Sequence, residues 1–514
     1  GAIWMIVFNP TRPLVAGAVF GGALLLMLAY IHPNVGTLYR QRFGVWLFFL
    51  LCGAVGWARV FLALLEQRVS DHGLTAQAAD AGRSGSVGTV STVDRVAASG
   101  AVVMLVTLLC YLGFFARDLL LVQRMGMTDS LDAFFTAAMI PMFFVTFLAM
   151  PMADALMLPF LSSGVGNPEQ RALLIRHTLG FALLLLGLTA LIVVATAPWL
   201  ITLVLGGQGA AQFDQAVVML RWFAPIVLLS AWTVVGNAAL NALGRSRDAA
   251  LGQLVVPAVT ITALIWVPPP QAATAALGGM LAGTMLNVYW VRRALQPLGI
   301  PLRPAMPRVH VLHAVTSSYH RLAGAALLTA ALVPLNYAFA AGVASGSVSA
   351  WALASKIVAL FSGLASVGAS AVVLPHLARI FSHRGKSGLR DDAYFLLMGG
   401  SWLGGGVAVG GVLFAEPLVG AALSGSASAE QVTALANIIK VGVLQVPVAI
   451  AGTLIAKMAI VSGASSRVVI SALAGCVVNL GANLVLVPHW GVMGVACGAL
   501  LAVVVSTVSM AAMA

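Results

Sequence analysis

Long apolar segments, each of about 20 residues or more, occupy most of this 514-residue chain. A helix needs about 20 consecutive apolar residues to cross the roughly 30 Å hydrocarbon core of a bilayer. Only 8% of the residues are charged, against about a quarter in a typical soluble domain, so the chain has too few charges to cover a soluble surface. The sequence therefore predicts an all-α polytopic membrane protein with about 14 transmembrane helices.

Two apolar runs come first, near 14–31 and 44–65. Twelve more follow near 100–123, 132–160, 172–205, 216–243, 249–267, 272–294, 314–341, 347–378, 393–420, 432–462, 466–487 and 491–513. Prolines interrupt several of these runs and are expected to kink them: Pro141, Pro151, Pro225, Pro334 and Pro447.

The runs suggest four parts of the chain. Residues 1–65 hold an extra N-terminal pair of transmembrane helices, and residues 66–98 form a polar, Gly- and Ser-rich linker. Two six-helix lobes follow, 99–296 and 297–514. No basic segment or convincing cleavage site accompanies the apolar start after Gly1, so no signal peptide is expected.

Basic residues gather in alternate loops between the twelve later runs. They include Arg171, Arg176, Arg245, Arg247, Arg292, Arg293, Arg303, Arg308, Arg379, Arg384, Lys386, Arg390 and Arg467. Cytoplasmic loops carry an excess of Lys and Arg, so both ends of the twelve-helix unit are predicted to be cytoplasmic. Arg40 and Arg42 conflict with this assignment, because it places them outside. The excess of Lys and Arg in cytoplasmic loops also explains the net charge of +12. Nucleic-acid binding is not expected, because no basic stretch is interleaved with aromatic residues.

A weak internal repeat relates the two lobes. At an offset of about 220 residues, similar residues pair as Arg247 with Arg467, Pro268 with Pro488, and Gly278 with Gly498. Duplicated transporters place the substrate site near the membrane midplane, between the halves. Chance recurrence of Gly, Pro and Arg at helix ends is the alternative interpretation.

Charged residues lie unusually close to the apolar runs. Arg117, Asp118 and Asp132 fall within 16 residues of each other in the stretches GFFARD and LDAFFT. Each charge at a bilayer centre costs about 2.5–3.5 kcal/mol on insertion scales. For Arg117 and Asp118, a lining of a cavity and a purely structural ion pair are both open interpretations.

Lys356 is the only Asp, Glu, Lys or Arg between Arg321 and Arg379. An unpaired ammonium inside a membrane is expensive, so it is expected to face water or an anion. We interpret Lys356 as a substrate-binding residue. The competing interpretation makes it a partner of Asp118 or Asp132 across the bundle.

Catalytic and cofactor motifs are missing from the sequence. GKS at 385–387 has Ile380 at the position of the first glycine of a P-loop, and neither HExxH nor GxSxG occurs. We therefore expect a transporter and no enzyme, with no cofactor and no metal. Its energy would come from the membrane potential, an ion gradient or substrate asymmetry.

Several motifs carry a family resemblance. LGFFARD (112–118), LDAFFTAAMIP (131–141) and LMLPFL (156–161) resemble the opening helices of the MurJ/MviN lipid II flippases, within the multidrug/oligosaccharidyl-lipid/polysaccharide exporter superfamily. The segment 344–363 followed by VVLPHL looks like the seventh-to-eighth helix region of that family. The resemblance implies that Arg117 and Asp132 match family positions in a cationic cavity and that Lys356 stands where the family usually has an arginine.

That family carries undecaprenyl-pyrophosphate-linked glycan from the inner to the outer leaflet, so the resemblance implies such a flippase in the bacterial inner membrane. By this interpretation Arg117 and Lys356 hold the pyrophosphate, while Asp118 and Asp132 hold or release these cations. Family arginines are replaced here by Cys110, Tyr111 and the stretch MFFVTF (142–147). An exopolysaccharide or O-antigen repeat-unit flippase is therefore an alternative, followed by a drug or cation antiporter and by a scaffold for polysaccharide synthesis proteins.

Overall fold

The structure is a computed structural model, and it describes residues 90–161, 168–205, 210–300, 302–368, 374–423, 427–461 and 465–513. The chain divides into two compact units, Gly1–Arg95 with Gly420–Ala422, and Val96–Val419 with Leu423–Ala514. Everything below concerns the second unit. The predicted helices at 14–31 and 44–65 lie outside the described residues.

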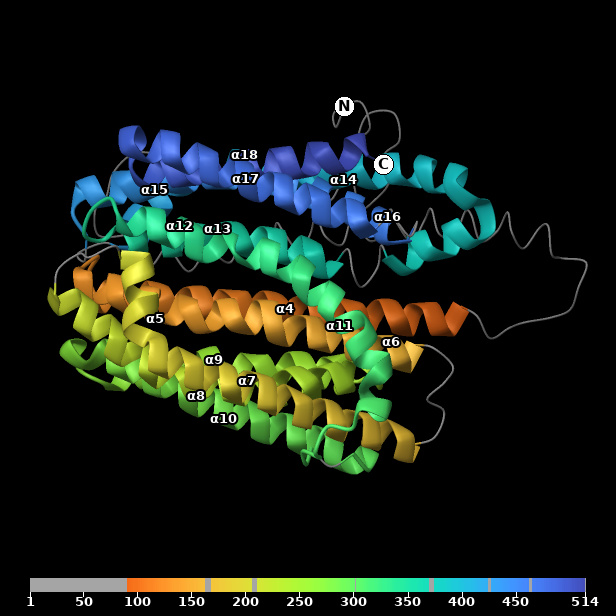
Figure 1. The fold of residues 1–514 in the computed structure, drawn as a ribbon. Coiled ribbons are helices and arrows are strands. Elements are labelled where there is room, and N and C mark those ends of the chain that lie inside the picture. Colours follow the sequence, from red (N-terminus) through yellow and green to blue (C-terminus); the bar gives the residue numbers. More distant parts are fainter. Residues whose placement is uncertain are drawn as a thin grey trace, which may run out of the picture. The chain divides into compact units, whose positions relative to one another are not determined.

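Every regular element in the described part of the chain is a helix (Figure 1). The elements are α4 (Val90–Met125), α5 (Asp129–Phe144), the π-helix η1 (Val145–Ala149), α6 (Met150–Leu161), α7 (Pro168–Leu205), α8 (Ala210–Ala242), α9 (Ser246–Trp266), the 3₁₀ turn η2 (Pro269–Gln271), α10 (Ala272–Leu295), the 3₁₀ turn η3 (Gln296–Leu298), α11 (Val309–Ala330), α12 (Leu332–Ala341), α13 (Ser347–Gly368), α14 (Leu374–Ala422), α15 (Ala429–Val443), α16 (Gln445–Val461), α17 (Ser465–Trp490) and α18 (Val492–Ala512).

Ten helical spans among the described residues are long and apolar enough to cross a membrane. The prediction of a multi-pass helical membrane protein is confirmed, while the count of 14 stays a prediction. The run at 347–378 contributes a shorter apolar helix, Ser347–Gly363. Helix α4 begins at Val90, so the last residues of the predicted linker are helical.

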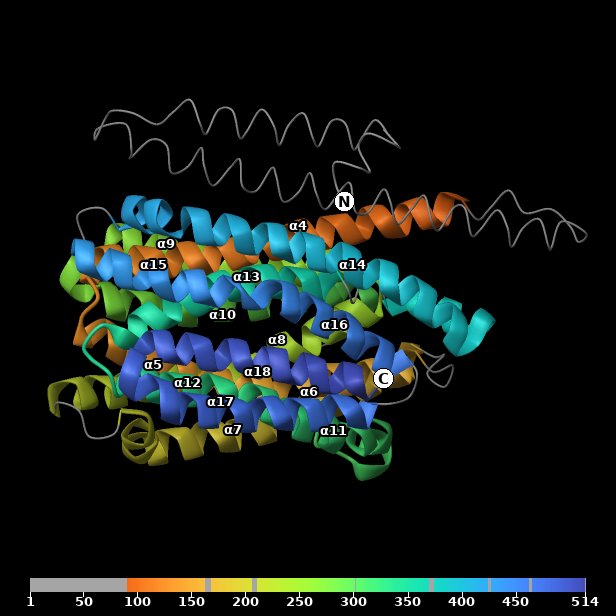
Figure 2. The same ribbon diagram turned by 90° about the horizontal axis from the view of Figure 1, so that it is seen from above.

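The helices of each half pack mainly on one another (Figures 1 and 2). In the first half, α8 contacts α5, α7 and α10, and α10 lies along α9. In the second half, α18 contacts α15, α16 and α17. Glycines permit these close approaches, since a Cβ at Gly279 or Gly283 would lie 2.8 Å from the Cα of Thr260 or Val256 in α9. Small residues let membrane helices meet backbone to backbone.

Four of the five prolines predicted to kink the runs adjoin a change in the helix. Pro141 and Pro151 flank the π-helix η1, Pro334 follows the junction of α11 with α12, and Pro447 follows the junction of α15 with α16. A proline lacks the N–H that would continue the helical ladder and its ring crowds the preceding turn. Pro225 differs, because α8 continues through it without a change of helix type.

The side chain of Tyr319 bonds a carbonyl within η1. A π-turn widens the helix and leaves its carbonyls with altered partners, which is costly inside a membrane. The hydroxyl of Tyr319 in α11 donates to the carbonyl of Leu148 at 3.0 Å. Helix α11 also contacts α6 and α7, so this first helix of the second half packs extensively on the first half.

The segment that joins the two halves is fastened to α7. The N–H of Ala305 donates to the carbonyl of Arg176 at 3.0 Å, and Nδ1 of His177 lies 2.6 Å from the carbonyl oxygen of Met306. Gly180 is required beneath this segment, because a Cβ there would collide with the carbonyl oxygen of Ala305. The connection is therefore held along the first half before α11 begins.

Candidate functional site

Three charged side chains from the two halves meet inside the unit: Arg117 and Asp118 of α4, and Lys356 of α13. Nη2 of Arg117 lies 2.6 Å from Oδ1 of Asp118, and Nε donates to the same oxygen at 2.8 Å. Nζ of Lys356 pairs with the other carboxylate oxygen, Oδ2. One carboxylate thus bridges two cations, and the cluster carries a net charge of +1.

The three groups differ in their access to solvent. The side chain of Asp118 is 0% exposed and that of Arg117 is 7% exposed, whereas 30% of the Lys356 side chain is exposed. Helix α13 packs against α5, α12, α15 and α16, and the neighbours Ala354 and Val358 are buried. Lys356 is therefore the least enclosed of the three side chains.

The cluster lies deep along the helices that carry it. Arg117 precedes the end of α4 at Met125 by eight residues, and Lys356 follows the start of α13 at Ser347 by nine. At a rise of 1.5 Å per residue, these separations are about 12 and 14 Å. Both helix ends lie at the same end of the unit, because Gly346 approaches Met127 closely. Half of a 30 Å hydrocarbon core is about 15 Å, so the cluster falls near the predicted midplane.

Soft and aromatic groups complete the surroundings of the two cations. Nη1 of Arg117 lies 3.3 Å from the sulfur of Met280, and its guanidinium carbon lies 5.2 Å from the centre of the Phe114 ring. Nζ of Lys356 lies 5.4 Å from the centre of the Phe135 ring. These cation–π contacts are weaker than a charge-assisted hydrogen bond to an anion.

Asp132 has a different set of partners from the predicted one. Its carboxylate accepts backbone N–H bonds from Gly346 at 2.8 Å, Ser349 at 2.8 Å and Val348 at 3.4 Å, and the residue is 2% exposed. A carboxylate at a helix N-terminus satisfies free N–H groups and opposes the helix dipole. In this conformation Asp132 of α5 therefore caps α13 and does not bond Arg117 or Lys356. The spacing of side chains along the sequence does not reveal backbone donors. The sequence therefore suggested cationic side chains as the partners of Asp132.

Arg124 caps another helix, α9. Its guanidinium donates to the carbonyl of Val267 and, at 3.2 Å, to that of Ile265, at the C-terminal end of α9. A cation there opposes the negative end of the helix dipole. Lys440 and Glu416 form another ion pair, of 3.2 Å, between side chains that are 30% and 54% exposed.

His313 and His320 of α11 form no metal cluster among the residues whose side chains are described. His313 and His320 are exposed, and no group of three or more His, Cys, Asp or Glu side chains in that part of the chain is arranged to hold a metal ion. The expectation that the protein needs no metal stays a prediction.

Sequence reasoning missed a second buried polar cluster, made by Asn336 of α12 with Asn479 and Asn483 of α17. Nδ2 of Asn483 donates to Oδ1 of Asn336 at 2.9 Å and to Oδ1 of Asn479 at 3.2 Å. Asn479 and Asn483 are fully buried. The available signal was a pair of asparagines four apart in an apolar run, a spacing that places both on one helix face.

Comparisons with known proteins agree with the fold. A solved structure described as lipid II flippase MurJ in an inward closed conformation matches with a TM-score of 0.67 and 16% identity, over 80% of this chain and 87% of that one. An inward-facing multidrug resistance MATE family transporter of the MOP superfamily matches with a TM-score of 0.66 and 16% identity, over 78% and 92% of the two chains. At these identities the likeness concerns the fold alone.

Sequence comparison separates these relatives. A probable lipid II flippase MurJ from Vibrio cholerae serotype O1 is 25% identical over 309 residues, which are 55% of this chain and 57% of the relative. The family model described as lipid II flippase MurJ matches residues 121–514, a range that contains Asp132 and Lys356 and begins just after Asp118. The model covers well over half of the sequence, and the chain belongs to the lipid II flippase MurJ family.

Proposed function

We propose that this protein moves a lipid-linked glycan with a pyrophosphate headgroup from the inner to the outer leaflet of the bacterial cytoplasmic membrane. The observation that carries the proposal is the bridging of Arg117 and Lys356 by the single carboxylate of Asp118. This cluster joins the two halves near the predicted midplane and keeps one net positive charge. Such a site suits an anionic headgroup and repels a cationic drug, which argues against the antiporter alternative.

In the mechanism, Lys356 and Arg117 exchange one anionic partner, Asp118, for another, the pyrophosphate. Asp118 holds Lys356 while no substrate is bound, so the two cations do not repel each other without compensation. A pyrophosphate supplies several anionic oxygens and would take Lys356 and Arg117 from Asp118 through charge-assisted hydrogen bonds. Loss of the Asp118–Lys356 pair would remove one link between α4 and α13 and so favour rearrangement of the halves.

Asp132 provides a second link between the halves, nearer the end opposite the arginine-rich loops. With this link formed, α5 and the start of α13 are joined there. The arginine-rich end is the predicted cytoplasmic one. The structure would then represent the state that accepts substrate from the inner leaflet, and opening would require Asp132 to release α13. We propose that the membrane potential or an ion gradient drives the cycle, with no cofactor.

The glycan could belong to the cell wall or to an exopolysaccharide, and each would imply partner enzymes that synthesise it. An aromatic cluster favours the exopolysaccharide-type unit as a second candidate substrate. Phe143, Phe144 and Phe147 contact one another, with ring centres 5.1–5.9 Å apart. They lie in the stretch where the family resemblance leads us to expect arginines. Fewer cations there favour a headgroup with less charge beyond its pyrophosphate.

Flipping by purified protein in liposomes tests the proposal. Lys356→Ala is expected to lower the rate at least about tenfold, since a lost charge-assisted contact is worth about 1.5–3 kcal/mol, and Lys356→Arg is expected to retain most activity. Lys440→Ala, which removes an exposed ion pair, is the matched control. Offering lipid II and an exopolysaccharide-type lipid-linked unit in parallel identifies the glycan. Full activity of Lys356→Ala with both substrates would refute the mechanism.

A further inference from the structure

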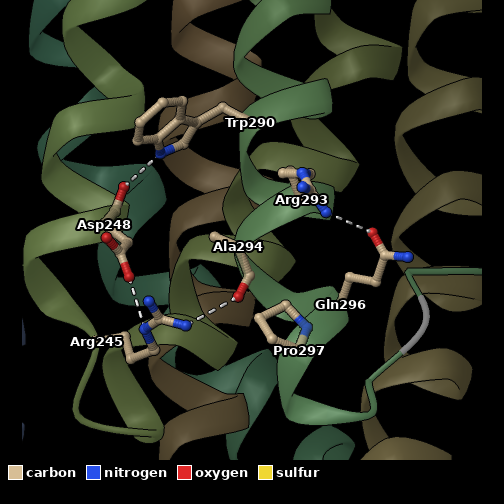
Figure 3. A pocket seen from close by; sticks show the side chains of 7 residues that line it. All are labelled: Arg245, Asp248, Trp290, Arg293, Ala294, Gln296 and Pro297. Carbon is tan, nitrogen blue, oxygen red and sulfur yellow. Dashed lines mark hydrogen bonds and ion pairs between the residues drawn. The ribbon is translucent and has the colours of Figure 1, made fainter.

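A separate pocket lies at the arginine-rich end of the first half (Figure 3). It has a volume of about 530 Å³ and is lined by Arg245, Asp248, Trp290, Arg293 and the turn Ala294–Pro297. Arg245 and Asp248 lie on one side, and Arg293 and Gln296 lie on the other. The pocket is formed by the α8–α9 turn and the end of α10, and it shares no residue with the Asp118 cluster.

Hydrogen bonds fix the walls of this pocket before any ligand arrives. Nε of Arg245 lies 2.6 Å from Oδ2 of Asp248, and its Nη1 donates to the carbonyl of Ala294 at 3.3 Å. The indole N–H of Trp290 donates to the backbone carbonyl of Asp248 at 3.0 Å. Gly252 allows this position of the ring, since a Cβ there would lie 2.9 Å from Cδ1 of Trp290. Arg245 and Trp290 are thus held in place.

The charge of the pocket selects an anion. Two guanidinium groups face a single carboxylate, and that carboxylate is already paired with Arg245. Arg293 is exposed, and Figure 3 shows its hydrogen bond to Oε1 of Gln296, which is long at 3.4 Å and which an anion would readily replace. Guanidinium groups match phosphate oxygens with paired N–H donors. A metal cation is disfavoured by two arginines beside one neutralised carboxylate.

The position of the pocket points to the source of the phosphate. Trp290 is 40% exposed and its neighbour Tyr289 is 65% exposed, next to Arg292 and Arg293 at the end of α10. Tryptophan and tyrosine beside arginine are typical of the headgroup level of a membrane. Basic pockets at that level on the cytoplasmic side bind anionic lipid headgroups. We propose that this pocket binds the phosphate of an anionic phospholipid in the cytoplasmic leaflet, at a site distinct from the transport site.

Native mass spectrometry of the full-length protein in a neutral detergent tests this proposal. Phosphatidylglycerol is titrated against wild type, Arg293→Gln, Arg245→Gln and the double variant, and an exposed arginine outside the pocket, Arg303→Gln, is the matched control. We expect one phosphatidylglycerol to bind wild type and Arg303→Gln with equal affinity. Arg293→Gln should weaken this binding at least about tenfold, and the double variant should abolish it.

Two further titrations identify the source. Phosphatidylcholine carries the same phosphate with a compensating cation and should bind at least about tenfold more weakly. Inorganic phosphate at millimolar concentration should not displace phosphatidylglycerol; displacement would show that free phosphate is the ligand and would overturn the lipid assignment. Because Arg245 also holds the α8–α9 turn, the thermal stability of each variant is measured. If Arg245→Gln fails to fold, the binding of phosphatidylglycerol to Arg293→Gln alone tests the site. Wild-type binding in Arg293→Gln, or equal loss in Arg303→Gln, would overturn the site.

Discussion

The carboxylate of Asp118 in α4 is the ion-pair partner of Lys356 in α13, although the two residues are 238 positions apart in the sequence. Because the same carboxylate also holds Arg117, the loss of one negative charge would leave two neighbouring cations without compensation. The cluster therefore couples the two halves through an interaction that is sensitive to a single substitution.

Asp118→Asn should destabilise the protein by about 3 kcal/mol, because removing one partner of a buried ion pair leaves the others unpaired. The apparent unfolding temperature in detergent measures this loss. The double variant Asp118→Asn with Lys356→Met should be more stable than Asp118→Asn alone, since one uncompensated cation has gone. An additive loss in the double variant would contradict the direct pairing of these residues.

Asp132→Asn should weaken the contact between α5 and the start of α13. An amide keeps one acceptor oxygen but loses the negative charge, which is worth up to about 2 kcal/mol at a partly buried helix N-terminus. That change shifts a two-state equilibrium by roughly 5- to 30-fold. Spin labels at the exposed positions Thr128 and Ser345 measure the opening. In the variant we expect a larger fraction of molecules with a long distance between the two labels. Lys440→Ala serves as a control, and an identical distance distribution in Asp132→Asn would rule out the capping contact as a latch.

Gly498→Ala should disturb the buried asparagine cluster, because a Cβ at this position would collide with Oδ1 of Asn483. The clash displaces the side chain that donates to both Asn336 and Asn479. The expected loss is about 1–3 kcal/mol, the usual cost of inserting an atom into a packed interior. Gly481→Ala in the adjacent helix is the control, since a Cβ there meets nothing within 4 Å. Equal melting temperatures for the two variants would contradict the packing described.

Gly180→Ala should release the segment between the halves from α7. The added methyl group would push away Ala305 and break its hydrogen bond to Arg176. Limited trypsin digestion measures the release, because Arg303 and Arg308 lie in this segment and are exposed. Cleavage there should be at least several-fold faster than in wild type. Gly324→Ala, with open space around its Cβ, should digest like wild type.

Much of the helical architecture was predictable because membrane spans are set by length and apolarity alone. Most of the later runs correspond to observed helices, although α14 begins at Leu374, well before the predicted start at 393. Four of the prolines mark changes in the helices. The predicted boundary of the linker differed because polar residues near Val90 still form the start of α4. Apolar runs predict the part of a helix that crosses the lipid, and they do not predict where the helix continues beyond it.

The chemistry of the site was harder to predict. The sequence suggested Lys356 as a binding residue and, as an alternative, a partner for Asp118, and the structure contains the pairing. Which carboxylate meets which cation depends on how the fold brings α4 and α13 together, and spacing along the chain does not encode it. Asp132 illustrates the limit, since its partners are backbone groups.

The fastening of residues 302–308 to α7 has a consequence for motion. The hydrogen bonds of this connection to α7, and the bond from Tyr319 of α11 to Leu148, restrict movement of the chain where the first half passes into the second. We infer that α11 travels with the first half, on which it packs through α6 and α7. A spin-label pair across α11 and α7 would then keep a constant separation through the cycle, while a pair across α11 and α13 would not.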